Sequence, residues 1–345
     1  MSIFITVAIT FLVLMIVYQI AQASEYAAAL RSTEKERQKK TNILMASLLV
    51  VFFILGLYAI WQCHFALLDR MLPKAASKQG EAYDTMFKVT LITTGIVFLI
   101  THVLLFWFAF KYKATDDRKT SFFFAHNNKL ELIWTTVPAI VMAVLVAIGL
   151  RNWMTVTSPA PAEAKVIEIV GKQFNWIVRY PGADNVLGKR NFRSINDATN
   201  VLGMDDKDPA SKDDVVAQNG EMHLVVNKPV KLIIGSRDVI HDVGLPHFRL
   251  KMDAVPGITT TLWFTPSITS AEMKEMTKNP NFVYEISCDQ MCGKGHYSMR
   301  GTIIVETQAE YDAWIAKQTP YFAPAAAPAA APADSAAATP AVAVN

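Results

Sequence analysis

Long apolar stretches dominate the first half of the chain, whereas short apolar and polar runs alternate in the second half. Four stretches, near residues 3–23, 42–62, 86–110 and 132–150, are apolar and long enough to cross a bilayer, which takes roughly 20 residues. We therefore predict an extra N-terminal pair of transmembrane helices within residues 1–63 and a transmembrane helical hairpin over residues 84–152.

The loops between these stretches differ in basic charge. Ser24–Thr41 and Lys111–Leu130 each contain five Lys or Arg residues, whereas Cys63–Thr85 contains three. Because basic loops tend to stay on the cytoplasmic side, we expect the N-terminus and everything after Asn152 to lie outside the cytoplasm.

The first apolar stretch has two interpretations. Ala21-Gln22-Ala23 is a plausible signal-peptide cleavage motif, but Met1 to Phe4 contains no basic residue and the apolar run is long for a signal peptide. We favour a retained helix, and the expected orientation of the C-terminal region is the same either way.

After a Pro/Ala linker at Thr157–Ala164, the chain changes to the pattern of short strands. The expected strands are Val166–Tyr180, Glu221–Val226, Val230–Ser236, His247–Met252, Thr259–Phe264, Phe282–Ser287 and Thr302–Val305. About seven such strands favour an all-β, Greek-key sandwich over residues 158–318.

A short helix and a low-complexity tail follow the strands. Thr307–Lys317 is predicted to be helical, with Thr307 as its cap and Glu310 three residues later. Residues 319–345, Ala/Pro-rich from Pro320 on, contain no pattern that could form a core, so we predict a disordered tail.

Composition supports a membrane protein and disfavours a nucleic-acid-binding one. The chain has 345 residues, of which 52% are hydrophobic, and its mean hydropathy is positive. Its net charge of +3 divides into +5 for residues 1–150 (14 basic, 9 acidic) and −2 for residues 151–345 (19 basic, 21 acidic). No basic domain remains to bind nucleic acid.

A long polar insertion, Pro181–Gly220, interrupts the predicted sandwich. It contains the charged run D-D-K-D-P-A-S-K-D-D at Asp205–Asp214. The run could be an acidic docking surface for a basic partner, but mixed charge clusters are usually solvated surface, which is the interpretation we favour.

Four potential soft or borderline metal ligands lie between the last two predicted strands: Cys288, Cys292, His296 and Met299. Thiolate, imidazole and thioether together favour copper. A mononuclear blue-copper loop needs only one Cys, so the second Cys argues for two copper ions bridged by two thiolates. Such a site needs a second imidazole, for which the sequence offers His241 and His247.

The chain from about residue 84 to residue 318 resembles subunit II of the haem-copper cytochrome c oxidases, on the strength of five motifs. They are H-N-N-K-L-E-L-I-W-T-T-V-P-A, G-K-Q-F-N-W, D-V-I-H, M-D-A-V-P-G and C-x3-C-x3-H-x2-M, in the family's order. The resemblance implies a membrane helical anchor followed by a cupredoxin sandwich that carries the binuclear copper centre CuA.

The resemblance also implies individual roles. Cys288 and Cys292 would bridge the two coppers, and His241 and His296 would each bind one. Met299 would be a weak ligand, and the backbone carbonyl of Gln290 another. His247 matches no family ligand, so we expect a loop histidine there. Glu131 matches a family glutamate near the entrance of a proton channel, although a carboxylate that merely ends a helix is equally compatible with its position.

Several positions depart from the family pattern. Gln290 stands where the family has a glutamate that reaches a magnesium ion at the interface with subunit I, which puts that ion in doubt. The family's electron-entry Trp is replaced by Phe174, with Trp176 two residues later, and Arg237 stands where a second acid is common. We therefore expect an altered docking surface for the electron donor.

The implied function is electron transfer within aerobic respiration. A c-type cytochrome, or a complex that bears one, would reduce CuA. Electrons would pass on to the haem of subunit I, where oxygen is reduced to water and protons are pumped. The chain has no C-x-x-C-H haem motif and so needs a separate donor. Expected partners are subunits I and III and membrane lipid, in the bacterial inner membrane with the C-terminal domain on the periplasmic side.

Two polar positions in the membrane segments need a separate interpretation. Cys63 adjoins His64 at the end of the second predicted span and has no further ligand nearby in sequence, so we expect an isolated Cys. His102, inside the third span, is a site candidate by default, but we favour a role in helix packing.

Four alternatives share part of the pattern. A copper chaperone would have Pro after the second Cys, where Gly293 stands here. A redox disulfide between Cys288 and Cys292 would not require His296 or Met299. A quinol oxidase subunit II has the same architecture but lacks the copper ligands, and nitrous oxide reductase carries the same centre on a soluble chain with a large propeller domain.

Overall fold

The computed structural model describes residues 2–31, 34–68, 71–113 and 123–323. It divides into two compact units, and each is described by itself. The membrane unit comprises Met1–Leu72 and Thr85–Leu150, and the sandwich unit comprises Pro73–Asp84 and the chain from Arg151 on.

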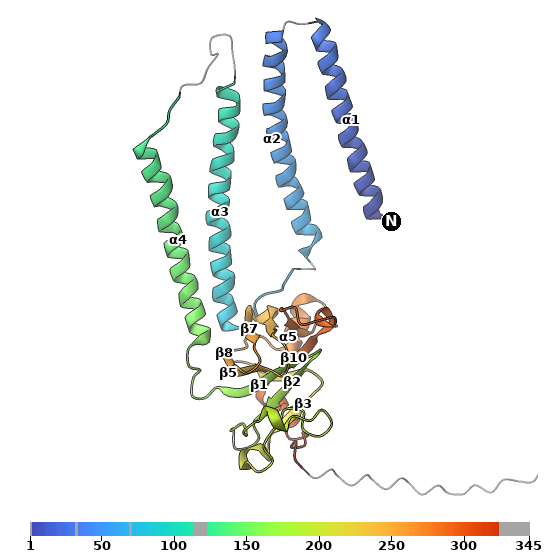
Figure 1. Cartoon of the computed structure of the whole chain (residues 1–345), viewed down its shortest axis with the longest axis vertical. Helices are drawn as coiled ribbons and strands as arrows, with labels where there is room; N and C mark the ends of the chain where they lie inside the picture. Colours follow the sequence, from blue (N-terminus) through green and yellow to red (C-terminus); the bar gives the residue numbers. More distant parts are fainter. Residues whose placement is uncertain (1, 32–33, 69–70, 114–122, 324–345) are drawn as a thin grey trace, which may run out of the picture. The chain divides into compact units, whose positions relative to one another are not determined.

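The membrane unit is built from long helices, drawn as uninterrupted ribbons in Figure 1. They are α1 Ser2–Arg31, α2 Glu34–Ala66, α3 Lys78–Lys111 and α4 Asn128–Thr157, and each contains a stretch long and apolar enough to cross a membrane. Their large side chains are exposed, such as Phe52 at 76%, as expected for surfaces that face lipid or other subunits. The helices match the four predicted spans.

His102 contacts a neighbouring helix, in line with the predicted packing role. Its ring stacks on Phe53 of α2 with 4.7 Å between ring centroids, and its Nδ1 lies 2.7 Å from the carbonyl oxygen of Phe98 on its own helix. The rings of Phe98 and Phe106 also lie near it, at 4.0 and 6.0 Å between centroids, so this histidine packs within an aromatic cluster.

The sandwich unit contains two five-stranded sheets, more strands than the seven predicted. The strands are β1 Lys165–Lys172, β2 Asn175–Tyr180, β3 Val215–Ala217, β4 Glu221–Val225, β5 Val230–Ser236, β6 His241–Leu245, β7 Leu250–Ala254, β8 Thr260–Phe264, β9 Tyr284–Cys288 and β10 Arg300–Glu306. One sheet has the order β3-β2-β1-β5-β8 and the other β4-β10-β9-β6-β7.

Alternating burial is clear in β5, β8, β9 and β10. In β5, Val230, Leu232 and Ile234 are buried in the core between the sheets. β1 has a continuous run of buried residues instead, because the insertion covers its outer face. There Val201, Leu202 and Met204 form a second apolar cluster with Val170 and Ile177.

The predicted strand Val166–Tyr180 is two strands. β1 and β2 pair as an antiparallel hairpin, with Lys172 opposite Asn175. The sequence contains no glycine-rich turn signal between them, because the turn consists of Gln173 and Phe174. This turn is adjacent to the metal centre described below.

The charged insertion has a structural role in addition to its solvated surface. Arg179 of β2, 1% exposed, binds Glu168 at 3.1 Å and also Asp214, and Arg190 binds the same Glu168 at 2.7 Å. Burial raises the pKa of Asp214 despite its bond to Arg179. The end of the predicted acidic run is thus part of a buried ion cluster and is not available to a docking partner.

Two short helices begin with the same capping motif. The predicted helix is α6, Gln308–Ile315, where Thr307 and Glu310 form a capping box. α5, Ser270–Thr277, was not expected, yet Thr269 and Glu272 form an identical capping box. The T-x-x-E spacing was therefore a usable signal for both helices.

The folded sandwich unit extends beyond the predicted boundaries of 158–318. Tyr321 and Phe322 pack against the cluster that contains Val201, and the Tyr321 hydroxyl accepts a hydrogen bond from the Val201 N–H at 3.0 Å. Residues 319–323 thus belong to the fold and not to a tail, and residues 324–345 lie outside the described residues.

A segment that precedes α3 and includes its first turns, Pro73–Asp84, is also part of the sandwich unit. The Arg249 guanidinium donates to Asp84 at 2.8 Å and to the Pro73 carbonyl oxygen at 2.6 Å. Ala76 exchanges backbone hydrogen bonds with His247 and Ser267, each at 2.8 Å. Since α3 begins at Lys78, its first turns, which precede the predicted hairpin boundary at residue 84, belong to the sandwich unit.

Candidate metal centre

Three segments of the sandwich unit bring the predicted soft ligands together. Cys288 ends β9 and His241 begins β6, and these two strands pair, with Val243 opposite Cys288. The loop after β9 contains Cys292 and leads into the short helix η5, His296–Ser298. His241 lay outside the predicted strands, and the pairing of β6 with β9 fixes its position beside Cys288.

The ligand atoms lie at nearly uniform separations. The two Sγ atoms are 3.8 Å apart, the His241 Nδ1 lies 3.7 Å from Cys288 Sγ, and the His296 Nδ1 lies 3.7 Å from Cys292 Sγ. Met299 Sδ is 3.9 Å from Cys292 Sγ, and the Gln290 carbonyl oxygen is 3.3 Å from Cys288 Sγ. All six predicted donors therefore meet at one place.

These separations fit a thiolate-bound metal and exclude a disulfide in this structure. Both cysteines are free, and 3.8 Å far exceeds the roughly 2.05 Å of an S–S bond. It is shorter than twice the about 2.3 Å of a typical metal–thiolate bond, so one ion can contact both sulfurs. Each cysteine also has its own imidazole, which is the arrangement expected for two ions sharing a pair of thiolates.

Burial favours the protonated form of the Cys292 thiol. Burial, and then the neighbouring Cys288 thiol, raise the pKa of Cys292 to about 11. A metal ion must therefore displace a proton to bind here, because only the thiolate is a strong ligand.

Asp238 orients His241. Its Oδ1 accepts a hydrogen bond from the His241 Nε2–H at 2.8 Å, which leaves Nδ1 to face Cys288. Burial alone would raise the pKa of Asp238, but bonds from the Gln173 N–H and from His241 hold it below its usual value. The sequence analysis assigned Asp238 no role of its own, whereas its carboxylate orients the predicted ligand His241, as outer-shell carboxylates commonly do.

The inner side of the centre is closely packed. The Trp176 ring lies edge-on to His241, with 5.9 Å between centroids, and Trp176 is fully buried. A Cβ on Gly171 would lie 2.6 Å from His241 Cδ2, so only glycine leaves room for the imidazole at this point of β1.

Comparison with known proteins agrees with the site. The model of the cytochrome c oxidase subunit II transmembrane domain matches residues 66–151, and that of the subunit II periplasmic domain matches residues 165–308. The alternative cytochrome c oxidase subunit 2 of Bradyrhizobium diazoefficiens is 35% identical over 243 residues, which cover 70% of this chain and 82% of that protein. The chain belongs to the cytochrome c oxidase subunit II family.

More distant relatives and a solved structure are similar as well. Cytochrome c oxidase subunit 2 of Thermostichus vulcanus is 22% identical, over 76% of this chain and 81% of the relative. The crystal structure of the periplasmic domain of cytochrome oxidase subunit II from Bradyrhizobium japonicum aligns at 25% identity, covering 45% of this chain and 94% of that one, with a TM-score of 0.29.

Membership of the family establishes the setting of the site. This subunit II chain is part of a haem-copper terminal oxidase complex, and its C-terminal sandwich is the cupredoxin-like periplasmic domain of a membrane protein. Copper is the metal that matches both the family and the donor set of two thiols, two imidazoles, a thioether and a carbonyl.

The other predicted site residues of this subunit II chain have different surroundings. His247 lies outside the centre and packs against Phe282 and Tyr284, at 5.0 and 5.4 Å between ring centroids. The Glu131 carboxylate accepts a hydrogen bond from the backbone N–H of Asn127 at 3.2 Å, at the start of α4. Cys63 is exposed on α2.

The two aromatic candidates for electron entry are not equivalent. Phe174 is partly buried and contacts the copper loop, since a Cβ on Gly295 would lie 2.5 Å from its ring. Trp176 has no exposed surface. Arg237 is largely covered, because its side chain is only 10% exposed and binds Asp197 at 2.9 Å. The expected change of the docking surface at this position therefore concerns a side chain that is held in place by an ion pair.

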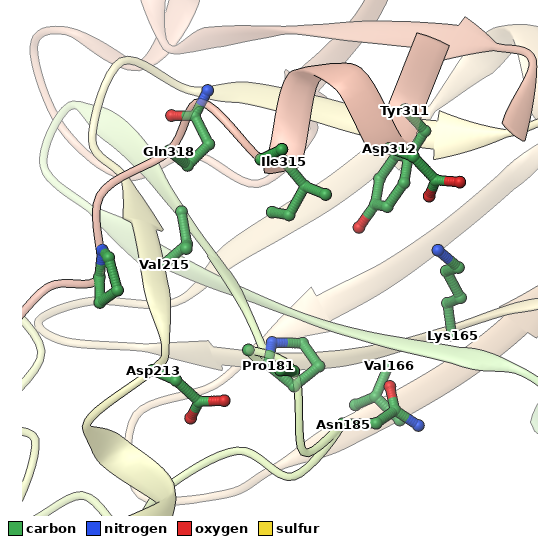
Figure 2. Close-up of a pocket in the computed structure, with 14 residues that line it drawn as sticks. Lys165, Val166, Pro181, Asn185, Asp213, Val215, Tyr311, Asp312, Ile315 and Gln318 are labelled. Carbon is green, nitrogen blue, oxygen red and sulfur yellow. The ribbon is translucent and has the colours of Figure 1, made fainter. Parts of the chain in front are cut away.

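A separate hollow of about 380 Å³ lies where β1 begins, whereas the copper ligands lie near its end at Gly171. Figure 2 shows Lys165 of β1 on one side of the hollow and Tyr311, Asp312 and Ile315 of α6 above it. The Lys165 Nζ sits 3.9 Å from the Tyr311 ring centroid. This hollow is thus distinct from the metal centre.

Proposed function

We propose that this subunit II accepts electrons from a c-type cytochrome at a binuclear CuA centre and passes them to the haem of subunit I. The overall reaction would be the reduction of oxygen to water, coupled to proton pumping. The observation that carries the proposal is the convergence of six donors, each within 4 Å of a cysteine sulfur. They come from Cys288, Cys292, His241, His296, Met299 and the Gln290 carbonyl.

Two copper ions bound there would supply one-electron redox chemistry. The chain's own residues hold the donors in a fixed arrangement, because His241 is on a paired strand and Cys288 and Met299 are buried. A rigid, buried ligand set changes little between redox states, which favours fast electron transfer. An interface magnesium ion is left out of the proposal, because Gln290 offers an amide where the family has a carboxylate.

For electron entry we propose Phe174 and assign Trp176 a packing role behind His241. Phe174 touches the copper loop and retains exposed surface, whereas Trp176 is fully buried. Phe174→Ala should slow reduction by the donor cytochrome. Tyr297→Ala, at another aromatic residue of the loop that is 84% exposed, is the matched control, and equal rates in both variants would contradict the assignment.

The remaining family roles complete the proposal. Glu131 is proposed to lie at the proton entrance shared with subunit I, and the partners are subunits I and III and a c-type cytochrome. The chain would reside in the inner membrane of a bacterium, with the copper centre on the periplasmic side.

The deciding experiment is metal analysis and electron paramagnetic resonance of the full-length chain, purified in detergent and loaded with copper. We expect two coppers per chain that share one unpaired electron, and loss of the shared signal in Cys288→Ser. Hyperfine structure from a single copper nucleus would rule out the binuclear centre. A chain that binds no copper would instead resemble a quinol oxidase subunit II.

A further inference from the structure

The turn between β1 and β2 touches both halves of the copper centre. One half is the loop from β5 to β6, which carries Asp238 and leads to His241. The other is the loop that carries Cys292 and His296. Gln173, the first residue of the turn, forms a hydrogen bond to each of them.

The first bond joins the turn to the histidine side. The Gln173 backbone N–H donates to Asp238 Oδ2 at 2.8 Å, and the other oxygen of the same carboxylate accepts the His241 Nε2–H at 2.8 Å. Gln173 therefore restrains the carboxylate that restrains the imidazole.

The second bond joins the turn to the cysteine side. The Gln173 side-chain Nε2 donates to the backbone carbonyl oxygen of Cys292 at 2.6 Å, in partly buried surroundings. The contact is made at the residue whose Sγ lies within 4 Å of Cys288, His296 and Met299. A shift of this carbonyl would move the sulfur at the middle of the donor set.

Packing by the next residue keeps the turn against the loop. The Phe174 ring lies against Gly295, where a Cβ would come within 2.5 Å of it. The loop can approach the turn this closely because position 295 has no side chain.

We propose that Gln173 is a positioning residue that sets the spacing between the two ligand-bearing loops. The inference rests on the proposed copper centre, but it concerns the protein scaffold and makes a prediction for the copper-free chain as well. The main-chain bond to Asp238 survives substitution, so the side-chain amide is the part that can be tested.

The test compares Gln173→Met, which keeps the length of the side chain but lacks the donor, with Gln218→Ala. Gln218 is an exposed glutamine of the same domain, and only its backbone takes part in a hydrogen bond in the described structure. In the copper-loaded full-length chain, Gln173→Met should weaken copper binding about 10- to 100-fold, the loss typical of outer-shell partners. It should also change the copper hyperfine pattern and the midpoint potential, while Gln218→Ala matches the parent chain.

A second readout needs no copper. In a Cys63→Ser background, the buried Cys288 and Cys292 are the remaining thiols. Their labelling by a thiol reagent should become about fivefold faster in Gln173→Met, the change in opening equilibrium expected for one lost hydrogen bond. Gln173→Asn, whose amide cannot reach Cys292, serves in its place if Gln173→Met does not fold.

The outcomes separate the two proposals. A parent chain with the shared-electron signal and a Gln173→Met chain with the same spectrum, affinity and labelling rate would overturn the positioning role alone. A parent chain without that signal would overturn the copper function, and the labelling rates would still decide whether Gln173 holds the loop.

Discussion

His241 and His223 are both buried in the sandwich and both bind a carboxylate, yet only His241 is arranged to hold a metal. In His241, Asp238 occupies Nε2 and Nδ1 faces the Cys288 sulfur. In His223, Glu306 occupies Nδ1 at 2.8 Å and Glu221 occupies Nε2 at 2.7 Å. A ring nitrogen that faces a soft donor, and not burial or a nearby acid, distinguishes the proposed ligand His241 from the structural His223.

His223 instead fastens the last helix to the second sheet. Its ring stacks on Trp314 of α6 with 3.7 Å between centroids and an interplanar angle of 11°. Glu306 is at the end of β10, which pairs with β4 beside His223. The carboxylates therefore hold this ring in the orientation that the stacking requires.

The largest expected effect is the loss of copper in His241→Gln. Removal of one of only two imidazoles should lower copper affinity by more than about 100-fold, beyond the loss typical of outer-shell partners. Copper titration of the full-length chain measures this, with His223→Gln as the matched control. If His223→Gln loses copper equally while it stays folded, the distinction between the two histidines is wrong.

Loss of the Asp238 carboxylate that binds His241 should have the next largest effect. In Asp238→Asn, the imidazole loses its charged acceptor, so we expect copper affinity to fall about 10- to 100-fold. Glu306→Gln makes the equivalent change at His223 and should leave copper binding unchanged. Equal affinities for Asp238→Asn and the parent chain would remove the orienting role of Asp238.

His223→Leu should destabilise the fold without affecting the metal site. The lost hydrogen bonds, chiefly the one to Glu306 at 12% side-chain exposure, are worth about 2 kcal/mol. For a domain of this size, that lowers the melting temperature by roughly 4–8 °C. Calorimetry of the copper-free chain is the measurement, and an unchanged melting temperature would show that the paired carboxylates contribute nothing.

A third histidine gives the smallest expected effect, one that depends on pH. Burial lowers the pKa of His247 from its ordinary value of 6.5. Its Nδ1 has no hydrogen-bond partner within the described ranges. Because the unfolded chain then binds the proton more tightly, the stability due to the neutral ring is complete above about pH 6.5 and declines as the pH falls below it.

The corresponding measurement is the pH dependence of the melting temperature between about pH 7 and 5. His247→Gln cannot be protonated in this range, so its melting temperature should fall less on acidification than that of the parent chain. Parallel curves would mean that His247 titrates alike in the folded and unfolded chain.

Local sequence signals predicted the elements whose causes are local. Apolar length gave the four membrane helices, alternation gave strands such as β5, and the pair Thr307 and Glu310 gave the start of α6. The same capping spacing at Thr269 and Glu272 precedes α5, a helix that was not predicted.

Features that depend on distant contacts were not predictable in this way. Nothing local to Gln173 indicates that its amide reaches Cys292, 119 positions later. Likewise, the buried role of Asp214 depends on Arg179, 35 positions earlier. The metal ligands could be predicted because few residue types bind a soft metal. Their supporting residues could not, because they depend on how distant loops fold together.

The contacts of Arg249 have a consequence for how the chain enters the membrane. They join Pro73 and Asp84, before most of α3, to a domain that is otherwise made after α4. Two pieces of one folded domain must be on the same face of the bilayer, so the chain between them must cross an even number of times. During biosynthesis the domain can close only after α4 has been inserted. Once this domain has folded, the start of α3 and the end of α4 are held on the same side of the membrane.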